Sequence, residues 1–470
     1  MLFSSISFLY YFLPVVFVLY FLVPFKFKNF VLLAASLFFY FYGEPVYVIL
    51  MVISSLSAYI HGLLIDKFRG TKWSKVFMIS SVIIGLSGLL FFKYTDFFIS
   101  NTNSLFGTNI SLINLALPIG ISFYTFQTIS YTIDVYREDA KVQKNFIHLA
   151  TYVSLFPQLI AGPIVRYTTI EEDLNDRKHT LEQFSSGAFR FVIGLAKKVL
   201  IADSFGYLCG AGQIFRESGE KSVLFYWLYA IAYCLQIYYD FSGYSDMAIG
   251  LGKIFGFRFL ENFNYPFISK SVSEFWRRWH MSLGSWFRDY VYIPLGGNKV
   301  SKLKWFRNVL VVWFLTGFWH GADWPFIVWG LYFALFLLLE KLFLAKWLEK
   351  LPKFVSHIYV FFVMIISFVI FNGNGLAGSL SDLGGMFGAL DIPFVNETTL
   401  YYIKSYAPMI IISAIGATPL VKTVAIKLRD SKKLGKAVNV IEPVIMVALL
   451  VVVTAYLVDS SANFFLYFRF

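Results

Sequence analysis

Long runs of apolar residues, separated by short polar segments, fill most of this 470-residue chain. A helix needs about 20 apolar residues to cross the hydrocarbon core of a bilayer, and runs approaching that length recur throughout the sequence. They lie near residues 5–23, 30–42, 46–65, 76–92, 113–133, 146–165, 189–201, 223–249, 309–319, 324–344, 356–371, 408–424 and 443–457. Several are short enough to be half-spans or re-entrant helices. The pattern predicts an all-α polytopic membrane protein with about ten to twelve crossings.

Composition supports a membrane environment and explains the positive charge. Charged residues make up 14% of the chain, whereas they make up about a quarter of a soluble domain. The net charge of +12 is carried by short loops between apolar runs, which favours a topological signal over a nucleic-acid surface. The cations that follow the first, third and fifth runs are Lys26, Lys28, Lys67, Arg69, Lys72, Lys75, Lys141 and Lys144. We therefore expect a multi-pass protein of the cell membrane whose amino terminus faces outward.

No internal repeat or long linker divides the sequence, which predicts one membrane domain over residues 1–470. Three polar segments interrupt it. Residues 101–109 are expected to form an outer loop, and residues 171–183 a solvated loop. Residues 258–305 mix charges, tryptophans and glycines, and we expect a re-entrant or interfacial segment on the cytoplasmic side. Cys209 and Cys234 are expected to be buried apolar residues.

The segment 258–305 contains the first candidate histidine. Ser271 and Glu274 have the spacing of a capping box, which predicts the start of a helix. On this helix Trp276 and Arg277 precede His280 by four and three residues, so we expect all three on neighbouring faces.

Two further arginines in this segment are candidate ligands. Arg288 lies eleven residues after Arg277 and would share its side of a continuous helix, unless Gly284 breaks the helix. Together with Arg278, they could bind the phosphates of an acyl donor, because guanidinium binds phosphate through two hydrogen bonds. A role as interfacial anchors remains an equal alternative.

The second candidate histidine lies at a predicted helix break. The run 309–319 is short and is followed by His320 and Gly321, while Asp323 and Pro325 are typical of the start of a new helix. Broken backbone at membrane depth is tolerated where protein or a water-filled cavity surrounds it. Ionisable side chains inside a membrane are costly and usually functional. The remaining histidines lack comparable surroundings and are expected to be structural; they are His61, His148, His179 and His357.

Several long strings resemble the membrane-bound O-acyltransferase family, and within it the branch of the alginate O-acetylation membrane protein. They lie at residues 117–126, 156–163, 240–246, 262–267, 275–283, 286–289, 293–297 and 317–321. The resemblance implies a fold of many helices around a central tunnel. It also implies that His320 is the essential histidine and His280 a second functional one. Trp276, Trp319, Asp289, Asp240 and Asp246 are candidate tunnel-lining residues.

Alternatives to these lining roles remain open. Tryptophans of this kind are more often packing or interfacial residues than substrate platforms. For Asp240 and Asp246, helix-packing hydrogen bonds with Gln236 are at least as well supported as a lining role.

The implied reaction passes an acetyl group from a cytoplasmic thioester to an extracytoplasmic polysaccharide. The donor would be acetyl-coenzyme A or an acyl-carrier protein, and no bound cofactor or metal is expected. A separate extracytoplasmic partner of the SGNH esterase-like type would complete the transfer. His320 suits the role of general base. His280 could orient the acceptor, donate to the oxyanion or protonate the leaving thiolate.

Three other functions compete with this one. A neighbouring branch of the family transfers D-alanine to teichoic acid and has a similar first-histidine segment. A conduit or exporter without catalysis would use the histidines only to line a path. A two-histidine haem or metal protein is the third, weakened by the lack of further ligands at suitable spacing.

Overall fold

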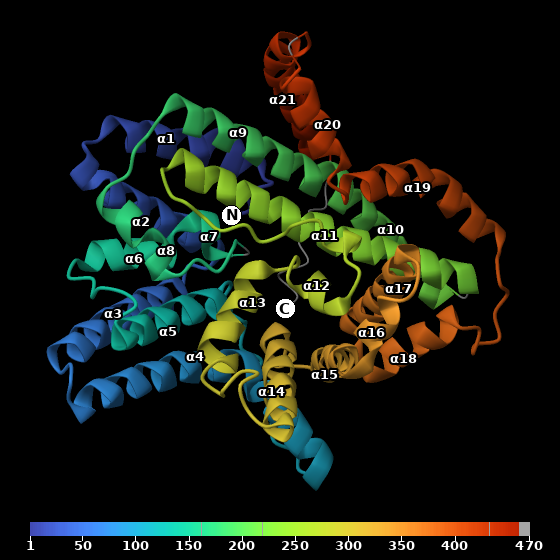
Figure 1. Ribbon diagram of the computed structural model, residues 1–470, viewed down its shortest axis with the longest axis horizontal. Helices are drawn as coiled ribbons and strands as arrows, with labels where there is room; N and C mark the ends of the chain where they lie inside the picture. The colour runs from blue at the N-terminus through green and yellow to red at the C-terminus, as the bar shows by residue number, and fades with distance from the viewer. Residues whose placement is uncertain (161, 219, 432, 460–470) are drawn as a thin grey trace. The chain divides into compact units, whose positions relative to one another are not determined.

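The all-α prediction is confirmed by a computed structural model, which describes residues 1–160, 162–218, 220–431 and 433–459. Every regular element among these residues is a helix (Figure 1). Five helices are long and apolar enough to cross a membrane, or six if a pair bent by 63° counts as one span. They are Val48–Lys67, Lys72–Phe106, Trp324–Leu348, Lys353–Asn372 and Gly435–Asp459, with Glu397–Gly416 and Leu420–Arg429 as the bent pair. A total of about ten to twelve crossings around a central tunnel stays a prediction.

The described residues form two compact units, each built from two stretches of chain. The first unit contains Met1–Phe191 and Tyr244–Glu261, and the second contains Val192–Gly243 and the described residues from Asn262 onward. Helices α9 (Leu181–Ala196) and α11 (Val223–Ile254) run from one unit into the other. The single membrane domain over residues 1–470 stays a prediction.

The first unit contains most of the amino-terminal helices. They are η1 (Phe8–Phe12), α1 (Leu13–Leu22), α2 (Phe25–Gly43), α3 (Val48–Lys67), α4 (Lys72–Phe106), α5 (Ile121–Arg137), α6 (Phe146–Ser154), α7 (Phe156–Leu159) and α8 (Tyr167–Asn175). Helix α4 extends into the segment 101–109, where a loop was expected. It ends at Phe106 and is capped by Gly107, whose φ of 64° is a left-handed conformation that glycine adopts without strain. The loop therefore begins six residues later than the polar composition predicts.

The polar segment 171–183 is only partly the solvated loop that its charges predict. Asp173 is buried and accepts a hydrogen bond of 2.9 Å from Nη2 of Arg258. Arg177 is buried as well, and its Nη1 donates to Oδ1 of Asn29 at 2.7 Å. The prediction is wrong for these two side chains because their partners come from distant parts of the sequence.

The second unit contains the remaining elements. They are η2 (Lys197–Ala202), α10 (Asp203–Ser218), η3 (Pro266–Ile268), α12 (Val272–Trp276), α13 (Met281–Phe287), η4 (Arg288–Tyr292), α14 (Lys302–His320), α15 (Trp324–Leu339), η5 (Glu340–Leu344), α16 (Ala345–Leu348), α17 (Lys353–Asn372), α18 (Gly375–Met386), α19 (Glu397–Gly416), α20 (Leu420–Arg429) and α21 (Gly435–Asp459). Between α12 and η4 the helices are short, and the break between α12 and α13 carries His280.

Helices α14 and α15 approach closely at two glycines. A Cβ added to Gly317 would lie 2.2 Å from the carbonyl oxygen of Phe326, and one added to Gly330 would lie 2.2 Å from the carbonyl oxygen of Trp313. Small residues at a helix interface let the two backbones come this near. The close contact fixes the end of α14, where His320 lies, against α15.

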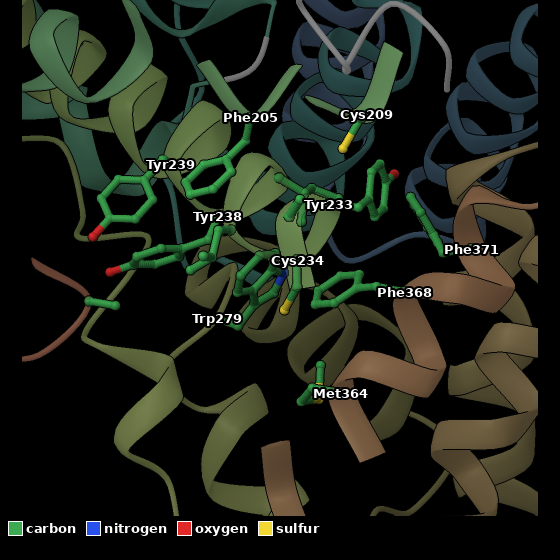
Figure 2. Packing of buried hydrophobic residues seen from close by; sticks show 14 of the residues in the cluster. Phe205, Cys209, Tyr233, Cys234, Tyr238, Tyr239, Trp279, Met364, Phe368 and Phe371 are labelled. Atoms are coloured by element: carbon green, nitrogen blue, oxygen red, sulfur yellow. The ribbon is translucent and has the colours of Figure 1, made fainter. Parts of the chain in front are cut away.

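An aromatic core supports the same region of the second unit. Figure 2 shows Trp279 beside Cys234, with Phe368 and Phe371 both on α17. The ring centroids of Trp279 and Phe368 are 5.5 Å apart. Cys209 and Cys234 are both buried members of this core, so the prediction that they are apolar core residues is confirmed.

Candidate active site

Helix α12 begins as the sequence predicts but ends before it reaches His280. Oγ of Ser271 accepts a hydrogen bond of 3.0 Å from the Glu274 N–H, which confirms the cap. The Glu274 carboxylate reaches back to the N–H of Lys270 at 2.9 Å. The helix ends at Trp276, so the prediction of a continuous helix that carries His280 beside Trp276 is wrong.

Backbone pairing with a distant segment explains this break. The Asn264 N–H donates to the carbonyl of Arg278 at 2.9 Å, and the Met281 N–H donates to the carbonyl of Asn262 at 3.0 Å. These bonds take the place of helical ones. His280 adopts a left-handed conformation with φ of 46°, which is uncommon for a residue other than glycine and is typical of functional sites. The break therefore falls at the histidine itself rather than at Gly284.

A buried carboxylate that the sequence reading missed holds the start of α12. Glu340 accepts hydrogen bonds from the Val272 N–H at 2.6 Å and from the N–H and hydroxyl of Ser273 at 2.9 and 2.7 Å. Tyr359 donates its hydroxyl to the same carboxylate at 3.1 Å. A negative charge at a helix N-terminus satisfies N–H groups that have no partner within the helix. The sequence feature that could have predicted this role is the position of Glu340, the single carboxylate inside the apolar run 324–344.

We expect Glu340→Leu to destabilise the protein by several kcal/mol, because each buried N–H left without an acceptor costs about 1–3 kcal/mol. The thermal unfolding midpoint of the purified protein in detergent measures the effect. Ser273→Ala is the matched control: it removes only the hydroxyl contact and should cost about 1 kcal/mol. Equal midpoints for Glu340→Leu and the wild type would show that the carboxylate does not hold α12.

His320 is the last residue of α14, at the break that the sequence predicts. Asp323 caps the next helix through a hydrogen bond of 2.7 Å from the Trp324 N–H to its Oδ1, as predicted. Gly321 has an extended backbone with φ of −164°, so conformational freedom is not why glycine is there. A Cβ on Gly321 would lie 2.2 Å from the ring of Phe326. Close packing after the helix end is therefore the physical reason for this glycine.

One indole contacts both candidate histidines. The ring centroid of Trp319 lies 6.2 Å from that of His280 and 4.9 Å from that of His320. The rings of Trp329 and Phe371 also pack against His320, with centroids at 5.0 and 5.4 Å. Two imidazoles forty residues apart in the sequence therefore belong to one aromatic cluster.

Trp276 packs into the same cluster from α12. Its ring centroid lies 4.8 Å from that of Trp313 and 5.5 Å from that of Trp329. These contacts agree with the packing role that is the alternative for this tryptophan. That Trp276 or Trp319 lines a tunnel stays a prediction.

The imidazole of His280 is 2% exposed and has one hydrogen-bond partner. Its Nδ1 lies 3.1 Å from Oδ1 of Asn262, and its Nε2 has no partner among the described residues. Burial lowers the pKa of His280 to about 3, so the ring is neutral at cellular pH. Asn262 is completely buried and was not among the candidate site residues. The sequence signal that could have identified it is the family-like string 262–267, which begins at this residue.

The three candidate donor-binding arginines differ in their partners. Arg278 forms an ion pair of 2.9 Å with Glu274, and Arg288 forms one of 2.6 Å with Asp289. Arg277 is exposed, its Nε donates to the carbonyl of Ser273 at 3.2 Å, and it has no carboxylate partner among the described residues. Donor binding by these arginines stays a prediction, and Arg277 has the guanidinium least engaged by protein.

The three candidate aspartates all take part in ion pairs. Asp240 is buried and lies 3.0 Å from Nζ of Lys198. Asp246 accepts from Arg190 at 2.9 Å in the first unit, and Asp289 is paired with the exposed Arg288. Their role as tunnel-lining residues stays a prediction.

Three of the other histidines have contacts typical of structural residues. Nδ1 of His61 lies 2.7 Å from the carbonyl oxygen of Ser57, and Nδ1 of His357 lies 3.1 Å from that of Ser269. Nε2 of His179 lies 2.8 Å from the hydroxyl of Tyr20.

Comparison with known proteins identifies related sequences over most of the chain. The family description of the membrane-bound O-acyltransferases matches residues 137–381. A probable alginate O-acetylase from Pseudomonas aeruginosa is 40% identical over 85% of this chain and 78% of its own length. A peptidoglycan O-acetyltransferase from Helicobacter pylori is 32% identical over 100% of this chain and 98% of its own. A teichoic acid D-alanyltransferase from Bacillus subtilis is 32% identical over 56% of this chain and 70% of its own.

Proposed function

Since this chain belongs to the membrane-bound O-acyltransferase family, we propose that it moves an acetyl group from a cytoplasmic thioester to a polysaccharide outside the cytoplasm. The observation that carries the proposal is the contact of one indole with both His280 and His320. Acyl transfer to an alcohol needs a proton acceptor. The packing of two imidazoles against one indole supports the proposal that both take part in this step.

The proposed chemistry assigns the proton to His320. A hydroxyl oxygen attacks the thioester carbonyl, the new C–O bond forms, and the C–S bond breaks. His320 takes the hydroxyl proton as general base, and the proton then passes to the leaving thiolate. The position of His320 at the C-terminal end of α14 favours the positive charge that this step places on the ring.

The proposed donor is acetyl-coenzyme A or an acyl-carrier protein, approaching from the cytoplasm. Lys299, Lys302 and Lys304 lie between the two histidine segments, and the positive-inside bias puts such a loop on the cytoplasmic side. Arg277 is exposed in the neighbouring segment and is a suitable ligand for a donor phosphate. We further propose that the protein is located in the cell membrane with its amino terminus outside, and that an extracytoplasmic esterase-like partner completes the transfer.

Acetyl is preferred to D-alanyl as the transferred group. The probable alginate O-acetylases from Azotobacter vinelandii and Pseudomonas aeruginosa match 80% and 85% of this chain. The D-alanyltransferase from Bacillus subtilis matches only 56% of it. An adjacent gene for an esterase-like protein would support acetylation, and one for an amino-acid-activating enzyme would support alanylation.

The proposed function predicts that deletion of the gene removes ester-linked acetate from a cell-surface polysaccharide. The experiment is to release esters from purified polysaccharide with mild alkali and to measure acetate and D-alanine separately. Acetate should fall in the deletion strain and return when the gene is restored. Loss of D-alanine with unchanged acetate would instead support the alternative transfer.

A conduit without catalysis is tested with the purified protein. Acetyl-coenzyme A is supplied with a polysaccharide acceptor, and release of the free thiol is followed. A conduit would release no thiol under these conditions, so thiol release that depends on the acceptor supports an enzyme.

A further inference from the structure

The amide of Asn262 is oriented by a backbone group. Its Oδ1 lies 3.2 Å from the N–H of Ser282 and 2.9 Å from the Ser282 hydroxyl. A backbone N–H only donates hydrogen bonds, so the side-chain atom facing it is the carbonyl oxygen and not the amide nitrogen. The opposite orientation would place an NH₂ group against an N–H. The assignment therefore follows from the hydrogen-bond network.

This orientation determines the tautomer of His280. The same Oδ1 lies 3.1 Å from Nδ1 of the imidazole. Because a carbonyl oxygen only accepts, Nδ1 must carry the proton. A neutral imidazole has one protonated nitrogen, so its lone pair is on Nε2.

Nε2 of His280 is a buried acceptor without a partner among the described residues. Phe241 packs edge to face against the ring with centroids 4.7 Å apart, and Trp319 contacts it at 6.2 Å. A buried polar atom left unpaired is costly, and such atoms need an explanation. A ligand that donates a hydrogen bond would satisfy this one.

We propose that Asn262 is a positioning residue that holds His280 in its Nδ1-protonated form, so that Nε2 accepts a hydrogen bond from a hydroxyl of the acyl acceptor. This inference rests on the proposed function. The bound hydroxyl is distinct from the one whose proton goes to His320, and a polysaccharide supplies several on each sugar. Of the three roles left open for His280, the tautomer supports orientation of the acceptor. An unprotonated Nε2 cannot donate to an oxyanion or to a thiolate.

The first test measures the tautomer directly. The protein is labelled with ¹⁵N-histidine and purified in detergent, and the His280 signals are assigned by their absence in His280→Gln. Nitrogen chemical shifts distinguish a protonated from an unprotonated ring nitrogen. We expect the proton on Nδ1 in the wild type and a shift of population toward Nε2 in Asn262→Leu, which keeps the size of the side chain but removes the acceptor. A wild-type proton on Nε2 would overturn the inference.

The second test separates positioning from a structural role. Transfer of labelled acetyl from acetyl-coenzyme A to polysaccharide is measured in membrane vesicles. We expect Asn262→Leu to reduce kcat/KM for the acceptor by about 100-fold, since a histidine in the wrong tautomer loses its function even where its geometry is kept. Ser282→Ala is the matched control, because it removes another donor to the same oxygen and leaves the imidazole contact. It should keep the tautomer and stay within about threefold of wild-type activity.

Asn262→Asp adds a readout that a structural role would not change. Its carboxylate still accepts from Nδ1 and should keep activity at high pH. Burial is the sole cause of the low pKa of His280, with no charged group contributing. The new carboxylate would raise this pKa, because a neighbouring negative charge favours the imidazolium. Activity should then fall as pH decreases, since the imidazolium has no lone pair on Nε2.

Two results would distinguish failure of this inference from failure of the proposed function. Wild-type tautomer and activity in Asn262→Leu, or a wild-type pH profile in Asn262→Asp, would refute the positioning role alone. If the wild type transfers no acetyl, the proposed function fails, and the nitrogen shifts still decide the tautomer.

Discussion

Replacing His320 with alanine is expected to reduce acetyl transfer by about 100- to 10,000-fold, the contribution typical of a positioned general base. The variant removes the proton acceptor at the end of α14, while the aromatic packing of Trp329 with Phe371 remains. Polysaccharide acetate in a deletion strain that expresses the variant measures the effect. The amount of variant in the membrane fraction should equal that of the wild type, because His320 is only half-buried and the α14–α15 contact does not depend on it.

Two further variants make this result specific. His320→Gln keeps hydrogen-bonding groups but cannot take a proton, so it should be as inactive as alanine. His61→Ala removes a histidine bonded to the Ser57 carbonyl at 2.7 Å and should retain wild-type transfer. Acetylation by His320→Ala at the wild-type level would exclude His320 as the base.

Replacing Lys198 with methionine is expected to destabilise the protein by about 3–5 kcal/mol, the cost of leaving buried charge uncompensated. Lys198 is 1% exposed, and its Nζ lies 2.6 Å from Asp203 and 3.0 Å from Asp240. Methionine keeps the length of the side chain but removes the ammonium group that contacts both carboxylates. The thermal unfolding midpoint in detergent and the yield in the membrane fraction measure the loss.

The triple variant Lys198→Met, Asp203→Asn, Asp240→Asn tests the reason for this loss. It removes all three charges, so it should recover a large part of the stability that the single variant loses. Arg288→Ala is the surface control, because Arg288 is 62% exposed in its pair with Asp289 and such pairs contribute about 0–1 kcal/mol. A triple variant no more stable than Lys198→Met would show that uncompensated charge is not the cause.

The apolar runs predicted the class of fold because the length of a run and its lack of charge are local properties. Helix ends marked by side-chain caps were equally readable: Ser271 and Asp323 both cap the helices that their positions predict. Loops were harder to predict from polar composition. Helix α4 continues to Phe106 through residues expected to form a loop, and Asp173 is buried among residues expected to be solvated. Composition does not report a partner that lies far away in the sequence.

The sequence by itself determined the helical membrane class, the helix break after His320 and the choice of His280 and His320 as candidate residues. The tertiary structure alone decided that α12 ends at Trp276, that Glu340 holds its first N–H groups, and that Asn262 orients His280. The physical reason is the range of the interactions. A cap or an apolar run acts over a few residues, whereas these hydrogen bonds join segments 18 and 68 residues apart, which only folding brings together.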